Sequence, residues 1–138
     1  MRDAILFDTH TAIWFTQGTL PQEASRILAA AALAEGLLLS PVVAWEVGLL
    51  ARSSRKGAVL GIDPGQWYAA LLAQPTISEC PLDGATMLAS TQLPGEFHKD
   101  PADRFLIATA RALDCSLMTR DAKILAYADQ GHVRAIPC

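Results

Sequence analysis

Four acidic residues of this sequence stand in apolar or structured surroundings, where a carboxylate needs a specific reason to be present: Asp8, Glu46, Asp103 and Asp121. If they converge in the fold, their mutual repulsion raises their pKa values unless a divalent cation is bound. Hard oxygen ligands select Mg²⁺ or Mn²⁺ rather than zinc. Such ions activate water and hold the oxygens of a phosphodiester. The acids therefore predict metal-dependent phosphodiester hydrolysis without a nucleophilic side chain.

Glu46 lies in the apolar stretch VVAWEVGLL, with hydrophobic neighbours on nearly every side of a predicted helix. A carboxylate in such a place is desolvated and needs a compensating partner, most simply a cation. A structural salt bridge to Arg52 or Arg104 is the alternative. We interpret Glu46 as a metal ligand.

Asp100 and Asp103 stand at the start of a predicted helix. Asp100 precedes Pro101, so its side chain is placed to accept hydrogen bonds from first-turn amides as an N-cap, with an outer-sphere metal contact as the alternative. Asp103 occupies the capping-box position, which is its structural alternative to a metal ligand. Asp121 is placed to cap the next helix and can also bind metal. Arg104 contacts either substrate phosphate or an acid.

Short β-like runs alternate with helical stretches along the chain. Strands are predicted at 4–7, 37–39, 76–80, 116–119 and 132–136. Helices are predicted from 24 to a stop at Gly36, and at 41–52, 64–73, 83–92, 101–112 and 122–128. A capping residue followed by proline marks three of these helix starts, at positions 40, 63 and 100. Segments 53–61 and 93–99 are predicted loops, and residues 9–20 receive no assignment.

This alternation predicts an α/β fold of three layers, with a central, mostly parallel sheet flanked by helices. Ligands of such sheets bind outside the carboxyl ends of the strands. Asp8 follows the first strand directly, and Asp121 follows the fourth after Thr119 and Arg120. Both side chains should therefore project into the same crevice.

The composition fits a single domain over 1–138. Of the 138 residues, 51% are hydrophobic and 18% charged, which supplies a core and argues against disorder. No apolar run approaches the roughly 18–20 residues of a membrane span, and no signal peptide is visible, so we expect a cytoplasmic protein. The cysteines fit neither a disulfide framework nor a zinc site and suit a reducing compartment.

The net charge of −3, from 14 acidic and 11 basic residues, counts against a nucleic-acid-binding protein when taken alone. The objection weakens if bound cations cancel several of the acids. Arg52, Arg55 and Lys56 are candidates for phosphate contact, against the alternative of a solvated loop. His10 and His98 are expected to be surface or hydrogen-bonded residues. The tryptophans are expected in the core or at a dimer interface: Trp14, Trp45 and Trp67.

Four segments occur in the order and spacing of the PIN-domain family and resemble most closely its VapC-like toxins: FDTHTAIWF, SPVVAWEVGLL, HKDPADRFLIATA and LMTRDAKILAY. The corresponding signature reads DTH, then WE, then H-x-DP-x-DR, then T-x-D. The resemblance spans essentially the whole chain. Ala44 departs from it, because serine is common at that position, and we expect only a local packing change there.

The resemblance implies a Mg²⁺- or Mn²⁺-dependent endoribonuclease whose metal-binding and catalytic acids are Asp8, Glu46, Asp103 and Asp121. It leaves Asp100 as the cap, and it matches Thr119 to a hydroxyl residue that orients a ligand or water. It also implies a homodimer and the toxin half of a type II toxin–antitoxin module, with the antitoxin in the active-site groove. The alternatives within the family are a nuclease that acts on DNA, a nuclease of RNA processing, and a catalytically silent binding module.

Two other classes of protein fit the sequence less well. A haloacid-dehalogenase-like phosphatase has a D-x-D pattern after its first strand, and His10 stands where the second aspartate belongs. A nucleotide-binding domain needs a glycine-rich loop after a strand, and neither GxGxxG nor GxxxxGK occurs.

Overall fold

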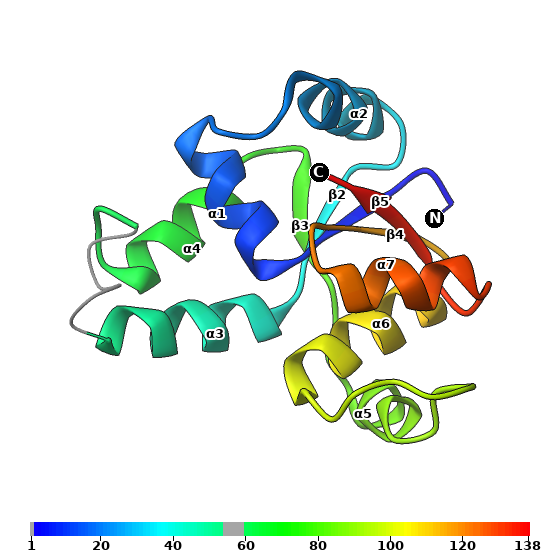
Figure 1. The fold of residues 1–138 in the computed structure, drawn as a ribbon. Helices are drawn as coiled ribbons and strands as arrows, with labels where there is room; N and C mark the ends of the chain where they lie inside the picture. The colour runs from blue at the N-terminus through cyan, green and yellow to red at the C-terminus, as the bar shows by residue number, and fades with distance from the viewer. Residues whose placement is uncertain (1, 54–59) are drawn as a thin grey trace.

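The computed structural model describes residues 2–53 and 60–138, and within these ranges five parallel strands form one sheet in the order β3-β2-β1-β4-β5 (Figure 1). The strands are β1 (Ile5–Phe7), β2 (Leu37–Leu39), β3 (Ile77–Glu79), β4 (Ser116–Thr119) and β5 (Arg134–Pro137). Leu6 of β1 lies opposite Leu38 of β2 on one side and Leu117 of β4 on the other. The predicted three-layer α/β fold is confirmed, and the described sheet is parallel throughout.

Helices cover both faces of this sheet. Consecutive strand residues point to opposite sides, so the apolar side chains of each strand contribute to a core on each face. Ile5 and Phe7 belong to a core with α1 (Thr9–Gln17), α2 (Gln22–Leu33) and α4 (Pro64–Leu72), to which α3 (Pro41–Arg52) adds Val43 and Val47. Leu6 belongs to a second core with α6 (Pro101–Leu113) and α7 (Ala122–Asp129). Helix α5 (Gly84–Ser90) packs on α6.

The capping signals place three helix starts correctly. Ser40 accepts from the amide of Val42 at 3.1 Å, and Asp63 and Asp100 also cap helices with proline in the first turn. Among the described hydrogen bonds, the Asp103 side chain does not accept from the amide of Asp100, as a capping box would require. The amide of Asp100 instead donates to Nδ1 of His98 at 3.2 Å.

The sequence pattern does not indicate α1, which is the main error in the predicted elements. Its threonines have modest helix propensity, and its apolar residues at 12–15 are contiguous rather than amphipathic. Asp8 caps its start, and Gly18 ends it in the left-handed conformation, at φ 68°. The error matters because α1 carries part of the site described below.

The tryptophans do not share one environment. Trp67 is 4% exposed and belongs to the core, as predicted, whereas Trp45 is 54% exposed on α3 and Trp14 is half-buried. A core position is therefore wrong for Trp45. Arg55 and Lys56 lie outside the described residues. No helix in the described part of the chain combines the length and apolar character needed to cross a membrane.

Candidate active site

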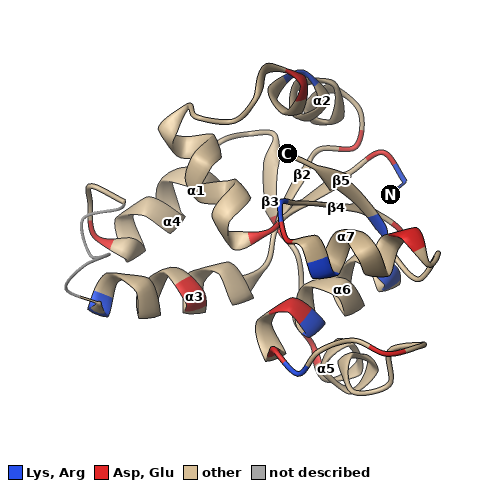
Figure 2. Ribbon diagram, in the orientation of Figure 1, with Lys and Arg blue, Asp and Glu red and all other residues tan. Residues whose placement is uncertain are grey.

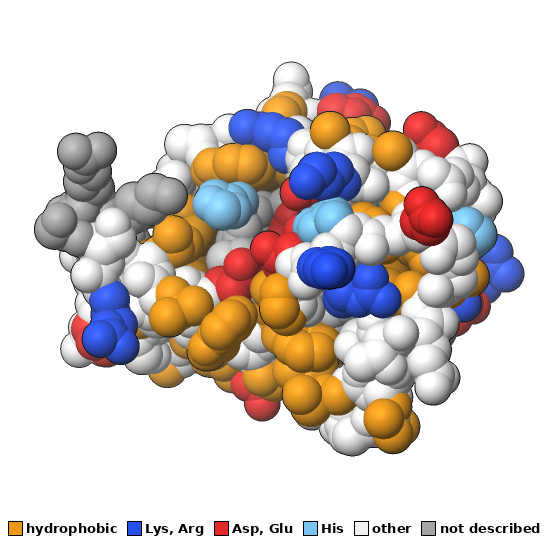
Figure 3. All heavy atoms as spheres, turned by 60° about the horizontal axis from the view of Figure 1, so that its bottom comes forward, with side chains coloured by type: hydrophobic (Ala, Val, Ile, Leu, Met, Phe, Trp, Pro, Cys, Tyr) orange, Lys and Arg blue, Asp and Glu red, His pale blue; other side chains and the backbone are white. Residues whose placement is uncertain are grey.

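The four predicted acids line one pocket at the carboxyl edge of the sheet. Asp8 follows β1, and Asp121 lies beyond Thr119 at the end of the neighbouring strand β4. Glu46 comes from the middle of α3, and Asp103 from the first turn of α6 (Figure 2). The pocket has a volume of about 430 Å³ and is lined by Asp8, His10, Trp14, Glu46, Asp100, Asp103, Arg120 and Asp121. Figure 3 shows acidic side chains gathered in a hollow of the surface.

Thr119 joins the two acids that follow the central strands. Its fully buried hydroxyl donates to Oδ2 of Asp8 at 2.6 Å and accepts from the amide of Asp121 at 3.0 Å. The other oxygen of Asp8 accepts from the amide of Thr9 at 2.7 Å. Burial raises the pKa of Asp8, and these two hydrogen bonds oppose the rise because they stabilise the carboxylate. The hydroxyl of Thr119 therefore holds the Asp8 carboxylate in this orientation.

Glu46 is held by a hydroxyl rather than by an arginine. Oε1 of Glu46 accepts from the hydroxyl of Thr9, the residue that also binds Asp8 through its amide. Within the described residues, Glu46 forms no ion pair with Arg52 or Arg104, so the alternative of a structural salt bridge is not supported. Burial raises the pKa of Glu46, and the negative charge of Asp8 raises it further.

Asp103 has a carboxylate that is poorly compensated in this structure. Burial raises its pKa to about 7, and the charges of the surrounding acids add to the effect. Nε2 of His98 lies 3.1 Å from Oδ2 of Asp103, but without hydrogen-bond geometry. Because Nδ1 of His98 accepts from the amide of Asp100, a ring proton must reside on Nε2, the atom that approaches Asp103. The sequence predicts a hydrogen bond for His98 but does not indicate this contact.

Arg104 points away from the acids. Its Nε donates to the carbonyl of Ser90 at 2.8 Å, and its Nη1 donates to the carbonyls of Phe97 and His98 at 3.1 and 3.3 Å. It does not line the pocket and pairs with no acid within the described residues. The guanidinium therefore holds the segment before α6 in place. In contrast, Arg120 and Trp14 line the pocket, and the sequence offered no local signal for either.

The donor chemistry of the pocket fits a hard divalent cation. All five carboxylates present oxygen donors, and burial raises the pKa of three of them, with the charges of neighbouring acids adding to the rise. As the side chains stand, no three His, Cys, Asp or Glu residues in the described ranges are arranged to hold one ion. Mutual repulsion favours such separation of carboxylates. Binding would therefore involve side-chain rotation.

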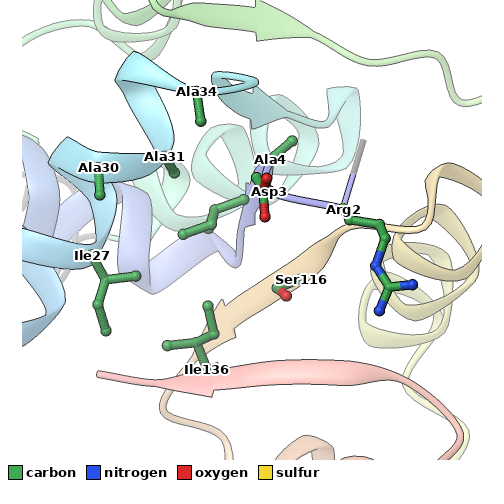
Figure 4. A pocket seen from close by; sticks show the side chains of 10 residues that line it. Arg2, Asp3, Ala4, Ile27, Ala30, Ala31, Ala34, Ser116 and Ile136 are labelled. Carbon is green, nitrogen blue, oxygen red and sulfur yellow. The ribbon is translucent and has the colours of Figure 1, made fainter.

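Another pocket, of about 340 Å³, lies at the opposite edge of the sheet, near the amino ends of β1 and β4 (Figure 4). Small and aliphatic side chains such as Ile27, Ala31 and Ile136 dominate its lining. Among the described residues that line it, Asp3 is the one acid and Arg2 the one base. It lacks the convergent carboxylates of the site at the carboxyl edge, so we assign the chemistry to that site.

One family of known proteins matches most of the chain. Residues 5–130 match the family model described as the PIN domain. A comparison with curated protein sequences finds no match.

Solved structures give similar folds at low sequence identity. A chain of the VapBC2 complex from Rickettsia felis, bound to a DNA fragment from its promoter, is 12% identical, with a TM-score of 0.70 over 97% of this chain and 98% of that chain. A chain of DNA-bound VapBC from Salmonella typhimurium is 15% identical, with a TM-score of 0.66 over 99% and 98%. A chain of a toxin–antitoxin complex from Klebsiella pneumoniae is 24% identical, with a TM-score of 0.59 over 88% and 90%. At these identities the likeness shows a shared fold.

Proposed function

The chain belongs to the PIN-domain family, whose members are generally nucleases, and we propose that it is a Mg²⁺- or Mn²⁺-dependent endoribonuclease acting as the toxin of a type II toxin–antitoxin module. The observation that carries the proposal is the convergence of five carboxylates in one open pocket at the carboxyl edge of the sheet. The raised pKa values of Asp8, Glu46 and Asp103 support it, because burial and neighbouring acids disfavour the charged carboxylates in a site without a bound cation.

The proposed metal ligands are the four acids on separate elements: Asp8, Glu46, Asp103 and Asp121. When bound, the ion would supply an activated water and neutralise charge on the phosphodiester. Thr119 holds Asp8 in place through its hydroxyl, and Thr9 connects Asp8 to Glu46. Asp100 caps α6 through the amide of Asp103, so it positions the turn that carries this ligand.

The proposed partners follow from the similar structures. The similar chain from Klebsiella pneumoniae comes from a toxin–antitoxin complex, so we propose a cognate antitoxin that covers the active-site groove. Action on RNA in the cytoplasm is proposed on the resemblance of the sequence motifs. A homodimer is part of the proposal. It is supported by large hydrophobic side chains exposed on α3 and α5, which would lose contact with water if these helices formed an interface: Trp45, Leu49, Met87 and Leu88.

The proposal is tested by incubating the purified chain with total RNA, and in parallel with duplex and single-stranded DNA, in Mg²⁺, in Mn²⁺ and in EDTA. The Asp103→Asn variant tests the site. Asp129→Asn makes the same change of charge at an exposed position at the far end of α7 and serves as its control.

We expect discrete, metal-dependent cuts in RNA by the wild type and by Asp129→Asn, and none by Asp103→Asn. Preferential cleavage of DNA would contradict the choice of substrate. Equal residual activity in the wild type and Asp103→Asn would identify a contaminant and leave the silent binding module as the better description.

A further inference from the structure

Arg120 is a cation among the acids of the pocket, yet it pairs with none of them. It lies in the short connection between β4 and α7, between Thr119 and Asp121. Of the eight described residues that line the pocket, five are acidic, and Arg120 is the one lysine or arginine. Within residues 2–53 and 60–138, Arg120 forms no ion pair with an Asp or Glu side chain.

An aromatic ring and a backbone oxygen hold Arg120 instead. Its guanidinium carbon lies 3.8 Å from the centroid of the Trp14 ring, which is a cation–π arrangement. Its Nε donates to the backbone oxygen of Cys138 at 2.8 Å. The ring of His10, one turn earlier on α1, lies 5.7 Å from that of Trp14. The side chain is therefore oriented, although Arg120 is exposed.

Burial of an aliphatic stem on an aromatic surface is the ordinary explanation for such an arginine. That packing does not explain why the guanidinium of Arg120 lies beside the acidic residues of the pocket. The terminal nitrogens have no hydrogen-bond acceptor among the described residues, because the guanidinium donates only through Nε. A planar group with its terminal nitrogens open matches the geometry of a phosphate. Arg120 therefore presents an anion-binding group at the rim of an acidic site.

We propose that Arg120 binds a backbone phosphate of the RNA strand at this pocket, and that Trp14 positions its guanidinium. The inference rests on the proposed function and adds a substrate contact to it. It also moves the expected phosphate contact from Arg104, whose guanidinium is occupied by backbone carbonyls, to Arg120. Nearby carboxylates repel a polyanion, so a cation held in place beside them draws the strand toward the metal ligands.

Binding of a fluorescein-labelled single-stranded RNA of mixed sequence, followed by anisotropy over a range of NaCl concentrations in Mg²⁺, tests the proposal. All proteins carry Asp103→Asn so that the RNA stays intact. Arg120→Gln should weaken binding by about tenfold or more, since one charge-assisted contact is lost. It should also reduce the slope of log K against log salt by about 0.7, the value for one phosphate of a single strand.

Arg26→Gln is the matched control, because it removes an exposed arginine on α2 that pairs only with Glu23 on the same helix among the described residues. Arg120→Lys keeps the charge and should retain the salt slope with part of the affinity. Trp14→Leu should weaken binding in the parent and have no further effect in the Arg120→Gln background, because Trp14 acts through the arginine.

The outcomes separate this inference from the proposed function. If Arg120→Gln matches its parent in affinity and salt slope, Arg120 does not contact phosphate. If Arg26→Gln weakens binding as much as Arg120→Gln, the effect is one of net charge, and the inference is also overturned. If the parent protein binds no RNA at all, the proposed RNA substrate fails, and the assignment of Arg120 fails with it.

Discussion

Two buried threonines connect acidic residues of the site to one another. Thr119 links Asp8 to the backbone of Asp121, and Thr9 links Asp8 to Glu46. Both threonines are buried, so their hydroxyls have no competing water. The orientation of the Asp8 and Glu46 carboxylates therefore depends on these neutral donors before any cation is present.

Thr119→Val should remove that orientation while keeping the shape of the side chain. Asp8 then loses the hydroxyl that lowers its pKa, and the amide of Asp121 loses its acceptor. We expect metal affinity and cleavage to fall by about 10- to 100-fold, as for other residues that orient metal ligands. The unfolding free energy should fall by about 1–3 kcal/mol for the unpaired groups. Calorimetric Mg²⁺ titration and chemical unfolding measure these losses, and Thr119→Ser should restore both.

Asp103 should make the stability of the metal-free protein depend on pH. Its pKa rises from an ordinary 3.8 to about 7 in the folded state, mainly through burial. Between these values the folded protein holds a proton that the unfolded chain has released, so stability falls as pH rises. Thermal unfolding in EDTA should show the wild type losing stability relative to Asp103→Asn from about pH 4 to pH 7. A difference that stays constant over this range would contradict the raised pKa.

Helix starts are the elements that assemble the site. Asp8, Asp100 and Asp121 each cap a helix, namely α1, α6 and α7, and all three line the pocket. A helix N-terminus carries partial positive charge, so it stabilises a carboxylate at its cap. This arrangement brings several acids together at a smaller electrostatic cost than isolated carboxylates would have.

Gly18 tests how far the site depends on α1. Gly18 ends the helix with φ 68°, a backbone conformation that strains any residue with a side chain. No atom lies within 4 Å of the position that a Cβ would occupy, so the strain comes from the backbone and not from a clash. Gly18→Ala should lower the unfolding free energy by about 1 kcal/mol or more. Because Asp8 and Trp14 lie on or beside α1, hydrogen exchange of the amides at 9–17 should increase as well. Gly18→Asn tolerates the left-handed conformation better and should lose less.

The exposed apolar side chains provide a test of the proposed homodimer. Trp45 is 54% exposed and Leu88 is 65% exposed, on α3 and α5. If these helices form the proposed homodimer, Leu88→Glu should shift the protein to a monomer in light scattering coupled to size exclusion. Glu23→Gln on α2, away from these helices, should leave the mass unchanged. A wild type that is already monomeric at high concentration would contradict the proposed dimer.

The sequence by itself determined the features that depend on a few neighbouring residues. The strand at 4–7, the capped starts of α3, α4 and α6, and the positions of Asp8 and Asp121 after neighbouring strands are all local patterns. Their physical basis acts within one turn or one strand: capping hydrogen bonds, proline geometry and the period of apolar residues. Because parallel strands align their carboxyl ends, convergence of these two acids followed from the order of elements.

Only the tertiary structure decided which side chains meet. Thr9 bonds to Glu46 across 37 residues and Thr119 to Asp8 across 111, and Arg120 stacks on Trp14 while Arg104 turns to backbone carbonyls. Arg104 and Arg120 each stand next to an acidic residue in the sequence, and nothing local states which of the two will face the pocket. The helix α1 has a local cap at Asp8, but its contiguous apolar residues do not show which face it buries. That face is set by packing against the sheet, and packing is a property of the folded chain.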